Sequence, residues 1–294
     1  MTVASRAALT PAMRRHAVIA RRRAGEYVAH GLLFGATALS AALLLLVVSY
    51  VVVRGLPALD LAFFTEGPLP FGDVGGGVAP AILGTVLMSA IAAAMAVPIG
   101  VAAAVFTTEL RTGRYSEPVR FAAELIAGLP SIVVGVFVWA ALVRTLVGSF
   151  AGIAGAVALA IIMVPIVTRT VEEVLRLVPN SLREAGLALG APRRRVILNV
   201  VIPTARAGIV TGIVLALARA AGETAPLLLT ALGNVYLSFD LLQPMAALPL
   251  QIYQYAVSPY DDWHTKAWGS SLVLLIVIGI VSATLRLVVR RGEG

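Results

Sequence analysis

The chain has 294 residues, of which 59% are hydrophobic and only 13% are charged, and its mean hydropathy is +0.93. A soluble domain carries charge on roughly a quarter of its residues, so this composition excludes an ordinary soluble protein and predicts an all-α integral membrane protein. Cysteine is absent and the three histidines are scattered, which excludes disulfides and thiolate metal sites; we predict no metal site.

Six apolar segments follow one another along the chain, each near the roughly 20 residues that a membrane-spanning helix needs. The predicted transmembrane helices cover residues 30–53, 80–106, 122–143, 147–168, 207–229 and 267–287. The apolar stretch of the first helix exceeds the roughly 7–15 residues of a signal-peptide core, so we expect a retained anchor. Before the second helix, the segment GDVGGGVAP predicts a flexible, irregular approach to a helix that starts near Pro80.

Basic residues are distributed unevenly between the two sides of these spans. Six lie in the tail 1–29, three in the loop 107–121, seven in the loop 169–206 and three at the C-terminal end. The loops on the other side contain only Arg54, Arg144 and Lys266. Because positive charge collects on the cytoplasmic side, both termini are predicted to be cytoplasmic, with 1–29 as a basic tail. Topology thus accounts for the net charge of +8, and no nucleic-acid partner is expected.

The loop between the fourth and fifth spans is long and has a helical pattern. Ser181 and Glu184 have the spacing of a capping box, and Gly190 followed by Pro192 predicts the end of that helix. A second amphipathic helix is expected from about residue 193 to 201, ahead of Pro203. The pattern therefore favours two short helices at the cytoplasmic surface, with a merely solvated basic loop as the alternative.

The segment EAGLALGAPRRRVILNVVIP, at 184–203, resembles the EAA loop of permease subunits of ABC importers. The matching residues are Glu184, Ala185, Gly190, Val200, Ile202 and Pro203, while Gly186 stands where that family usually has alanine. The resemblance implies a type I ABC importer permease fold, in which the loop 172–206 carries a coupling helix that docks on an ATPase subunit. The sequence has no Walker motif, so ATP is expected to bind elsewhere.

Four further motifs resemble permeases of the PstA type, from phosphate importers: GGGVAPAILGT (75–85), GLPSIVVGVFVW (128–139), ARAAGETAPLLLTA (218–231) and LPLQIYQY (248–255). This resemblance covers most of residues 75–290, the expected transporter domain. It implies a non-catalytic, multi-pass subunit of the bacterial inner membrane that moves by alternating access. The implied partners are phosphate, a PstC-type permease, two ATPase subunits and an extracytoplasmic phosphate-binding protein. No cofactor is expected on this chain, because ATP and Mg would be used by the ATPase.

Two charges, Arg219 and Glu223, interrupt the fifth predicted span. A charge at mid-bilayer costs about 2.5 kcal/mol or more, so each is a candidate functional residue. Their spacing of four places them on one helix face, where they can pair near the middle of the membrane. A guanidinium offers donors that match phosphate oxygens, so we expect Arg219 to contact the anion and Glu223 to tune it, with Thr224 on the same pathway.

The neighbouring edge of this helix has small residues at every fourth position, which permits close helix packing. The expected packing residues are Gly208, Gly212, Ala216 and Ala220. At the cytoplasmic end of the fourth span, Arg169 and Glu172 are expected to form a second pair near the exit of the pathway, and the family resemblance implicates the same positions.

Other interpretations stay open at this stage. The pair of Arg219 and Glu223 can instead fix helix register or bond to the neighbouring permease, and Arg169 can simply reflect topology. The substrate can be another oxyanion, such as sulfate or molybdate. A proton-coupled carrier with Glu223 as relay is a further alternative, although no inverted repeat supports it. No nucleophile–base arrangement supports a membrane enzyme.

Overall fold

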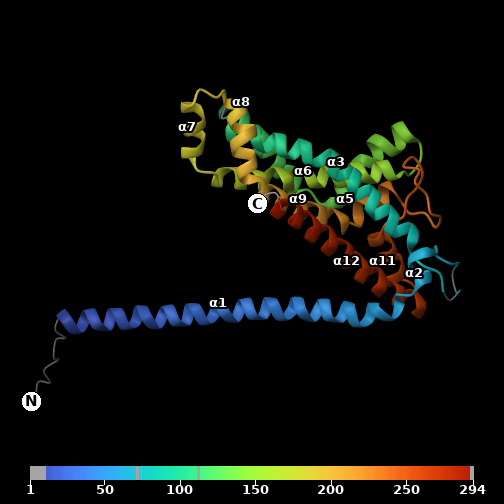
Figure 1. Cartoon of the computed structure of the whole chain (residues 1–294). Coiled ribbons are helices and arrows are strands. Elements are labelled where there is room, and N and C mark those ends of the chain that lie inside the picture. The colour runs from blue at the N-terminus through green and yellow to red at the C-terminus, as the bar shows by residue number, and fades with distance from the viewer. Residues whose placement is uncertain (1–10, 71–72, 74, 111–112, 292–294) are drawn as a thin grey trace, which may run out of the picture. The chain divides into compact units, whose positions relative to one another are not determined.

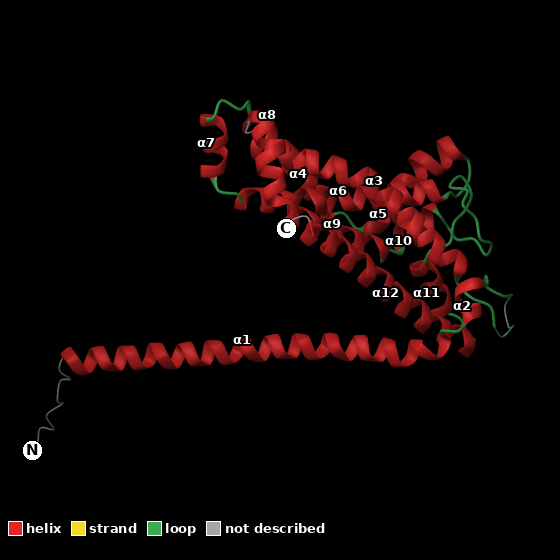
Figure 2. Ribbon diagram, viewed as in Figure 1, coloured by secondary structure: helices red, strands yellow, loops and turns green. Residues whose placement is uncertain are grey.

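The computed structural model describes all residues except 1–10, 71–72, 74, 111–112 and 292–294. The described residues form helices and loops and no β-strand (Figure 2). The chain divides into two compact units, Met1–Val53 and Arg54–Gly294. In its described part, the first unit consists of most of one long helix, α1 (Pro11–Gly55).

The second unit holds the rest of the helices (Figure 1). In chain order they are η1 (Leu56–Ala58), α2 (Leu61–Thr65), α3 (Ala79–Glu109), α4 (Gly113–Gly128), α5 (Ser131–Val138), the π-helix η2 (Trp139–Val147), α6 (Gly152–Leu177), α7 (Asn180–Ala188), α8 (Arg193–Val196), the π-helix η3 (Ile197–Val201), α9 (Ile202–Ala221), α10 (Ala225–Thr230), α11 (Leu248–Ala256) and α12 (Asp261–Arg291).

Five described helices are long and apolar enough to cross a membrane, or six spans if one bent pair is counted. The five are Glu26–Ala58, Ala79–Glu109, Gly152–Leu177, Arg193–Ala221 and Asp261–Leu285. The bent pair stands where a continuous third helix was predicted, and its two halves meet at 100°. Pro130 explains the break, because proline lacks an N–H and disfavours helical geometry at the residue before it. The all-helical membrane class is thus confirmed, and the continuity of helix 122–143 is wrong.

The helix α6 forms the centre of the second unit. In the most apolar 18-residue stretch of α6, 61% of the residues are buried, whereas in the corresponding stretch of α12 only 22% are buried. The helices α3 and α9 both pack along α6, and their contact surface is rich in fully buried alanines, among them Ala92, Ala96 and Ala156. Lipid tails are as apolar as the helices, so close packing of small side chains is what holds such helices together.

The glycine-rich segment 75–78 has no regular secondary structure, as predicted, but hydrogen bonds hold it in place. The N–H of Gly77 donates to the carbonyl of Gly67 over 3.0 Å, and the N–H of Val78 donates to the carbonyl of Phe63 over 2.9 Å. The ammonium of Lys266 also donates to the carbonyl of Gly75. The start of α3 at Ala79 agrees with the prediction of a helix beginning near Pro80.

Candidate functional site

The fifth predicted span is broken at the two charges that interrupt it. The helix α9 ends at Ala221, and α10 starts only at Ala225, so Glu223 and Thr224 lie in a short non-helical segment. The prediction of one helix over 207–229 is therefore wrong. Pro226 supplies the reason, because in a continuous helix its ring would clash with the carbonyl four residues earlier, at Gly222. The proline was visible in the sequence, but Pro98 and Pro165 lie inside the continuous helices α3 and α6, so a proline alone does not predict a break.

The two charges remain close to each other despite the break. Arg219 Nε lies 3.9 Å from Glu223 Oε1, which is an ion pair without a hydrogen bond. The side chain of Arg219 is 64% exposed and that of Glu223 is 15% exposed. Thr211 and Leu215 are exposed on the same face of α9 as Arg219. The guanidinium donors are thus available on a face that the other described helices leave uncovered.

The small residues lie on the neighbouring edge of α9, which packs on α6. A Cβ atom added to Gly208 would lie 2.4 Å from Val174 Cγ1, and one added to Gly212 would lie 2.4 Å from Thr170 Oγ1. Ala216 and Ala220 are fully buried. The helices therefore approach so closely that larger side chains have no room, which directs Arg219 away from the packed side.

The two broken spans meet each other. The short helix α10 packs against α5, which follows the break at Pro130. At the contact, a Cβ atom on Gly135 would lie only 2.8 Å from Pro226 Cα. The break before α10 thus lies next to a helix of the other broken span. Non-helical backbone at membrane depth is tolerated only where protein or a water-filled cavity surrounds it, and here the packing of α10 on α5 supplies protein on one side.

The expected pair of Arg169 and Glu172 does not form. Glu172 is buried, and its Oε1 atom accepts from Arg120 Nε and from Arg176 Nη2, each over 2.5 Å. Arg169 lies on the exposed side of α6. Although Arg169 and Glu172 are only three residues apart, the side chain of Arg169 is exposed, whereas that of Glu172 is buried and contacts Arg120 of α4. The prediction missed Arg120 because it comes from a different helix, and it missed Arg176 although the spacing of four residues was visible in the sequence.

The loop after α6 forms a helix–turn–helix. The helix α7 begins at Asn180, with Pro179 rather than Ser181 in the capping position, so the predicted capping box is wrong. Gly190 ends the turn with φ of +79°, a left-handed conformation that glycine adopts without strain. Glu184 and Ala185 are exposed on α7. Gly186 faces Val196 of α8, and a Cβ atom added to this glycine would lie only 2.9 Å from Val196 Cγ2. Its replacement of the usual alanine therefore allows close contact between α7 and α8.

The second helix of this loop continues into the membrane, whereas the sequence predicted a separate helix. Residues Arg193–Ala221 form one helix through α8, the π-helix η3 and α9. Pro203 lies just after η3, and the wider π turns accommodate a residue that cannot donate an N–H to the preceding turn. A displacement of the exposed loop would therefore be carried along one rigid element toward Arg219.

A cluster of charges that the sequence did not reveal anchors α7. The carboxylate of Glu109, the last residue of α3, accepts from Arg183 Nη2 over 2.5 Å and from Arg183 Nε over 3.0 Å. Arg193 donates to the backbone carbonyl of Glu109. Beside this cluster lies a polar cavity of about 810 Å³, lined in part by Arg120, Arg176 and Glu184. The charges link the ends of α3, α6 and α7 at one end of the unit.

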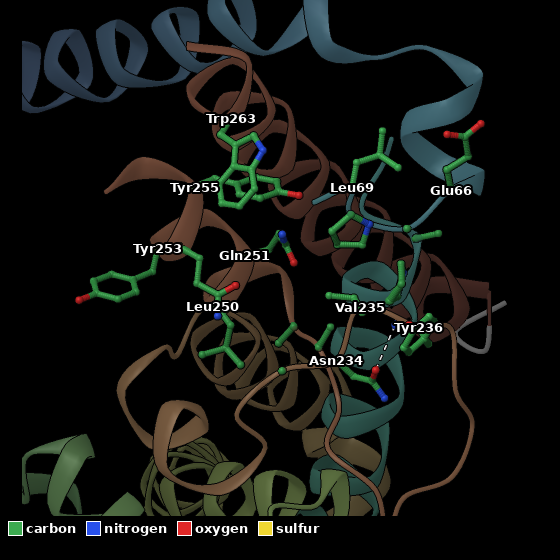
Figure 3. A pocket seen from close by; sticks show the side chains of 18 of the residues that line it. Glu66, Leu69, Asn234, Val235, Tyr236, Leu250, Gln251, Tyr253, Tyr255 and Trp263 are labelled. Carbon is green, nitrogen blue, oxygen red and sulfur yellow. Dashed lines mark hydrogen bonds between the residues drawn. The ribbon is translucent and has the colours of Figure 1, made fainter. Parts of the chain in front are cut away.

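The opposite end of the second unit, near α2 and α11 (Figure 1), holds a larger open cavity whose lining Figure 3 shows. It has a volume of about 1240 Å³ and lies between the chain around Glu66, the loop carrying Asn234 and Tyr236, and α11. Burial raises the pKa of Tyr255 in its wall to about 12, so this hydroxyl stays neutral. Among the described lining residues none is basic, so the cavity lacks a charge that would hold an anion.

Comparison with known families agrees with this architecture. Residues 96–291 match the family of binding-protein-dependent transport system inner membrane components. The match covers more than half of the chain, so the chain belongs to this family of multi-pass, non-catalytic inner membrane proteins.

Individual relatives define the family more narrowly. The chain is 45% identical over 242 residues to the phosphate transport system permease protein PstA of Xylella fastidiosa strain Temecula1, covering 82% of this chain and 84% of the relative. It is 46% identical over 231 residues to the PstA protein of Pasteurella multocida, covering 77% and 81%. Within the inner membrane components, the chain therefore belongs to the PstA phosphate permease family, as its motifs predicted.

Solved structures show the same fold. A chain from inward facing conformations of the MetNI methionine ABC transporter superposes with a TM-score of 0.58 at 22% identity, covering 73% of this chain and 94% of that one. At this identity the likeness concerns the fold alone, and it confirms the ABC importer permease architecture.

Proposed function

We propose that this chain forms one half of the translocation pathway of an ATP-driven phosphate importer, and that a second, similar permease forms the other half. The observation that carries the proposal is the broken span: Arg219 lies on an exposed face beside Leu215, and its mostly buried partner Glu223 lies in the break. An arginine at the membrane centre costs about 2.5–3.5 kcal/mol on insertion scales, so this face needs protein or water against it. A pathway between two permeases supplies both.

Arg219 is the residue we assign to the anion. Its pairing distance of 3.9 Å to Glu223 leaves the guanidinium donors free for phosphate oxygens. Glu223 would keep the site from holding phosphate too tightly and would give Arg219 a partner between passages. Thr224 stands at the start of α10 beside them and adds a hydroxyl to the same segment. Arg169, exposed at the far end of α6, would add positive charge near the exit.

The loop that contains α7 is the coupling element in this proposal. Glu184, Ala185, Gly186 and Gly190 build the exposed turn, which would dock on an ATPase subunit that holds ATP and Mg. From Arg193 to Arg219 the chain is one helix of about 39 Å at 1.5 Å per residue. Closure of two ATPase subunits would thus shift the pathway by rigid-body motion of attached helices.

The orientation follows from the distribution of basic residues. We place the α7 end of the second unit, with its arginine cluster, in the cytoplasm together with both termini. The end with the large cavity, which has no basic residue among its described lining residues, then faces outward, toward a phosphate-binding protein. Residues 75–290 would form the transporter domain and residues 30–53 a separate anchor. The boundary between the compact units after Val53 supports this division.

The test is ATP-driven uptake of labelled phosphate into liposomes that contain this chain with its partner permease and ATPase. We expect Arg219→Gln to lower uptake by about tenfold or more, because hydrogen bonds to charged groups contribute about 1.5–3 kcal/mol. Uptake by Arg219→Lys should lie between those of the unmodified chain and Arg219→Gln, because lysine keeps the positive charge but lacks the planar set of guanidinium donors. Arg144→Gln removes an exposed arginine away from the break and serves as the control.

Two results would contradict the proposal. Uptake that stays unchanged in Arg219→Gln would reduce the pair with Glu223 to a structural role. Efficient competition by sulfate would assign the pathway to oxyanions in general rather than to phosphate.

A further inference from the structure

Glu109 occupies an unfavourable position for a carboxylate. It is the last residue of α3, where the carbonyl ends of the helix create a partial negative charge. Its side chain is only 5% exposed, so water compensates little of that repulsion. A buried charge in such a place is stable only when a cation is held against it. Among the described residues, that cation is Arg183.

Arg183 joins three helix ends through a single guanidinium. It binds Glu109 at the end of α3 with two nitrogens, and it donates to the carbonyl of Leu175 near the end of α6 over 2.9 Å. It also donates to the carbonyl of Val178, in the link between α6 and α7, over 2.5 Å. A planar guanidinium with donors in fixed directions makes all of these contacts at once, whereas an ammonium group would keep the charge and make only some of them. Arg183 itself lies on α7, the predicted coupling helix.

The chain connectivity makes this contact mechanically important. The helices α6 and α9 are joined to the α7 loop by the backbone, so they follow its movements directly. The helix α3 has no such backbone connection, because α4, α5 and η2 separate it from α6 in the sequence. It packs along α6, and near its end the Thr107 carbonyl accepts from Arg120, which also binds Glu172 of α6, but neither contact reaches α7. At its cytoplasmic end, α3 is held to the loop through Glu109, which binds Arg183 and, through its carbonyl, Arg193.

We propose that Arg183 and Glu109 form a clamp through which the coupling helix moves α3 together with α6 and α9. Arg183 is thus a positioning residue for transport, in addition to the exposed positions of α7 that would meet the ATPase. The inference rests on the proposed function for the identity of the motor, but it concerns the motion of this chain and holds for any substrate. When the clamp is opened, ATP hydrolysis continues and α3 lags behind the loop.

Distance measurement tests the clamp directly. The chain has no cysteine, so cysteines introduced at Leu110 and Ser181, both exposed, can carry two spin labels on the end of α3 and on α7. The complete transporter in lipid nanodiscs would be measured without nucleotide and in an ATP-trapped state. In the otherwise unchanged chain we expect one narrow distance that is the same in both states. In Arg183→Gln and in Glu109→Gln we expect the distance to broaden and to change with nucleotide.

Coupling between hydrolysis and uptake provides the second readout. We expect phosphate uptake per ATP to fall roughly fivefold or more in either variant, within the usual range of coupling free energies. The double variant should be no worse than Arg183→Gln alone, because both changes open one contact. Arg183→Lys should recover part of the coupling. Arg176→Gln is the control, because it removes a neighbouring arginine that binds Glu172 and not Glu109. Glu172 still binds Arg120 in this variant, so coupling should stay unchanged.

The clamp would be overturned by a distance that already changes with nucleotide in the unmodified chain, or by losses that add in the double variant. A parallel fall of hydrolysis and uptake would also overturn it, since that pattern indicates failed assembly. If the transporter hydrolyses ATP without moving phosphate, the proposed function fails, and the spin-label distance still decides the clamp.

Discussion

Gly208 should be among the least replaceable residues of the second unit, and a single methyl group is enough to test this. A Cβ atom at this position would lie 2.4 Å and 2.7 Å from the two methyl groups of Val174, and 3.1 Å from its Cβ. Since both methyl groups are too close, rotating Val174 cannot relieve the contact, and α9 must move away from α6. Such overpacking typically costs about 1–3 kcal/mol, of which the better helix propensity of alanine offsets up to about 1 kcal/mol.

Thermal unfolding of the purified transporter in detergent measures this effect. We expect Gly208→Ala to lower the Tm by roughly 2–8 °C, because 1 kcal/mol corresponds to about 2–4 °C in a chain of this size. Gly279→Ala is the matched control, since Gly279 also lies within a helix but has nothing within 4 Å of an added Cβ. That change should leave the Tm unchanged or raise it slightly.

A compensating change makes the argument sharper. Val174→Ala removes both methyl groups that would collide with the Cβ atom introduced by Gly208→Ala, so the double variant should be more stable than the sum of the two single losses predicts. The coupling free energy should lie between about 0.5 and 3 kcal/mol. Equal Tm values for Gly208→Ala and Gly279→Ala, or strictly additive losses in the double variant, would refute close packing of α9 on α6.

Three further predictions concern the two ends of the unit. Ala185→Arg should abolish co-purification of the ATPase while leaving the Tm of this chain unchanged, because Ala185 is exposed on α7; retained binding would contradict docking there. Gly190→Val should lower ATPase binding more than Gly190→Asn, because valine strongly disfavours a φ of +79°; equal binding would show that the turn is not needed. Lys266→Met should speed proteolysis near Gly75, because it removes the ammonium group that donates to the Gly75 carbonyl. An unchanged cleavage rate would show that the backbone hydrogen bonds alone hold this segment in place.

The sequence determined the class of the protein because apolar length has a direct physical meaning in a membrane. A segment of some 20 apolar residues can reach across the bilayer whatever its neighbours are, so most spans were found close to their true positions. The motifs around 128–139 and 218–231 were sufficient to indicate the family. The sequence also predicted the helix end at Gly190, because glycine adopts the left-handed conformation that ends a helix without any contact from elsewhere in the chain.

The two breaks were missed although their signals were local. Pro130 and Pro226 each lie at a break, but both stand within apolar runs long enough to be interpreted as unbroken spans, and Pro98 and Pro165 lie inside α3 and α6 without breaking them. Apolar length measures only whether a segment prefers the membrane. It carries no information on whether the backbone inside the segment stays helical.

Only the tertiary structure decided which charges meet. Glu172 pairs with Arg120, 52 residues away, and Glu109 pairs with Arg183, 74 residues away. At a membrane end that holds many arginines, the sequence offers each carboxylate several possible partners, and its nearest neighbour in the chain was the wrong choice for Glu172. Packing of α3 and α4 on α6 selects the partner, because an ion pair in a buried place needs two groups within a few ångströms. The sequence thus determined what lies in the membrane, and helix packing decided which residues act together there.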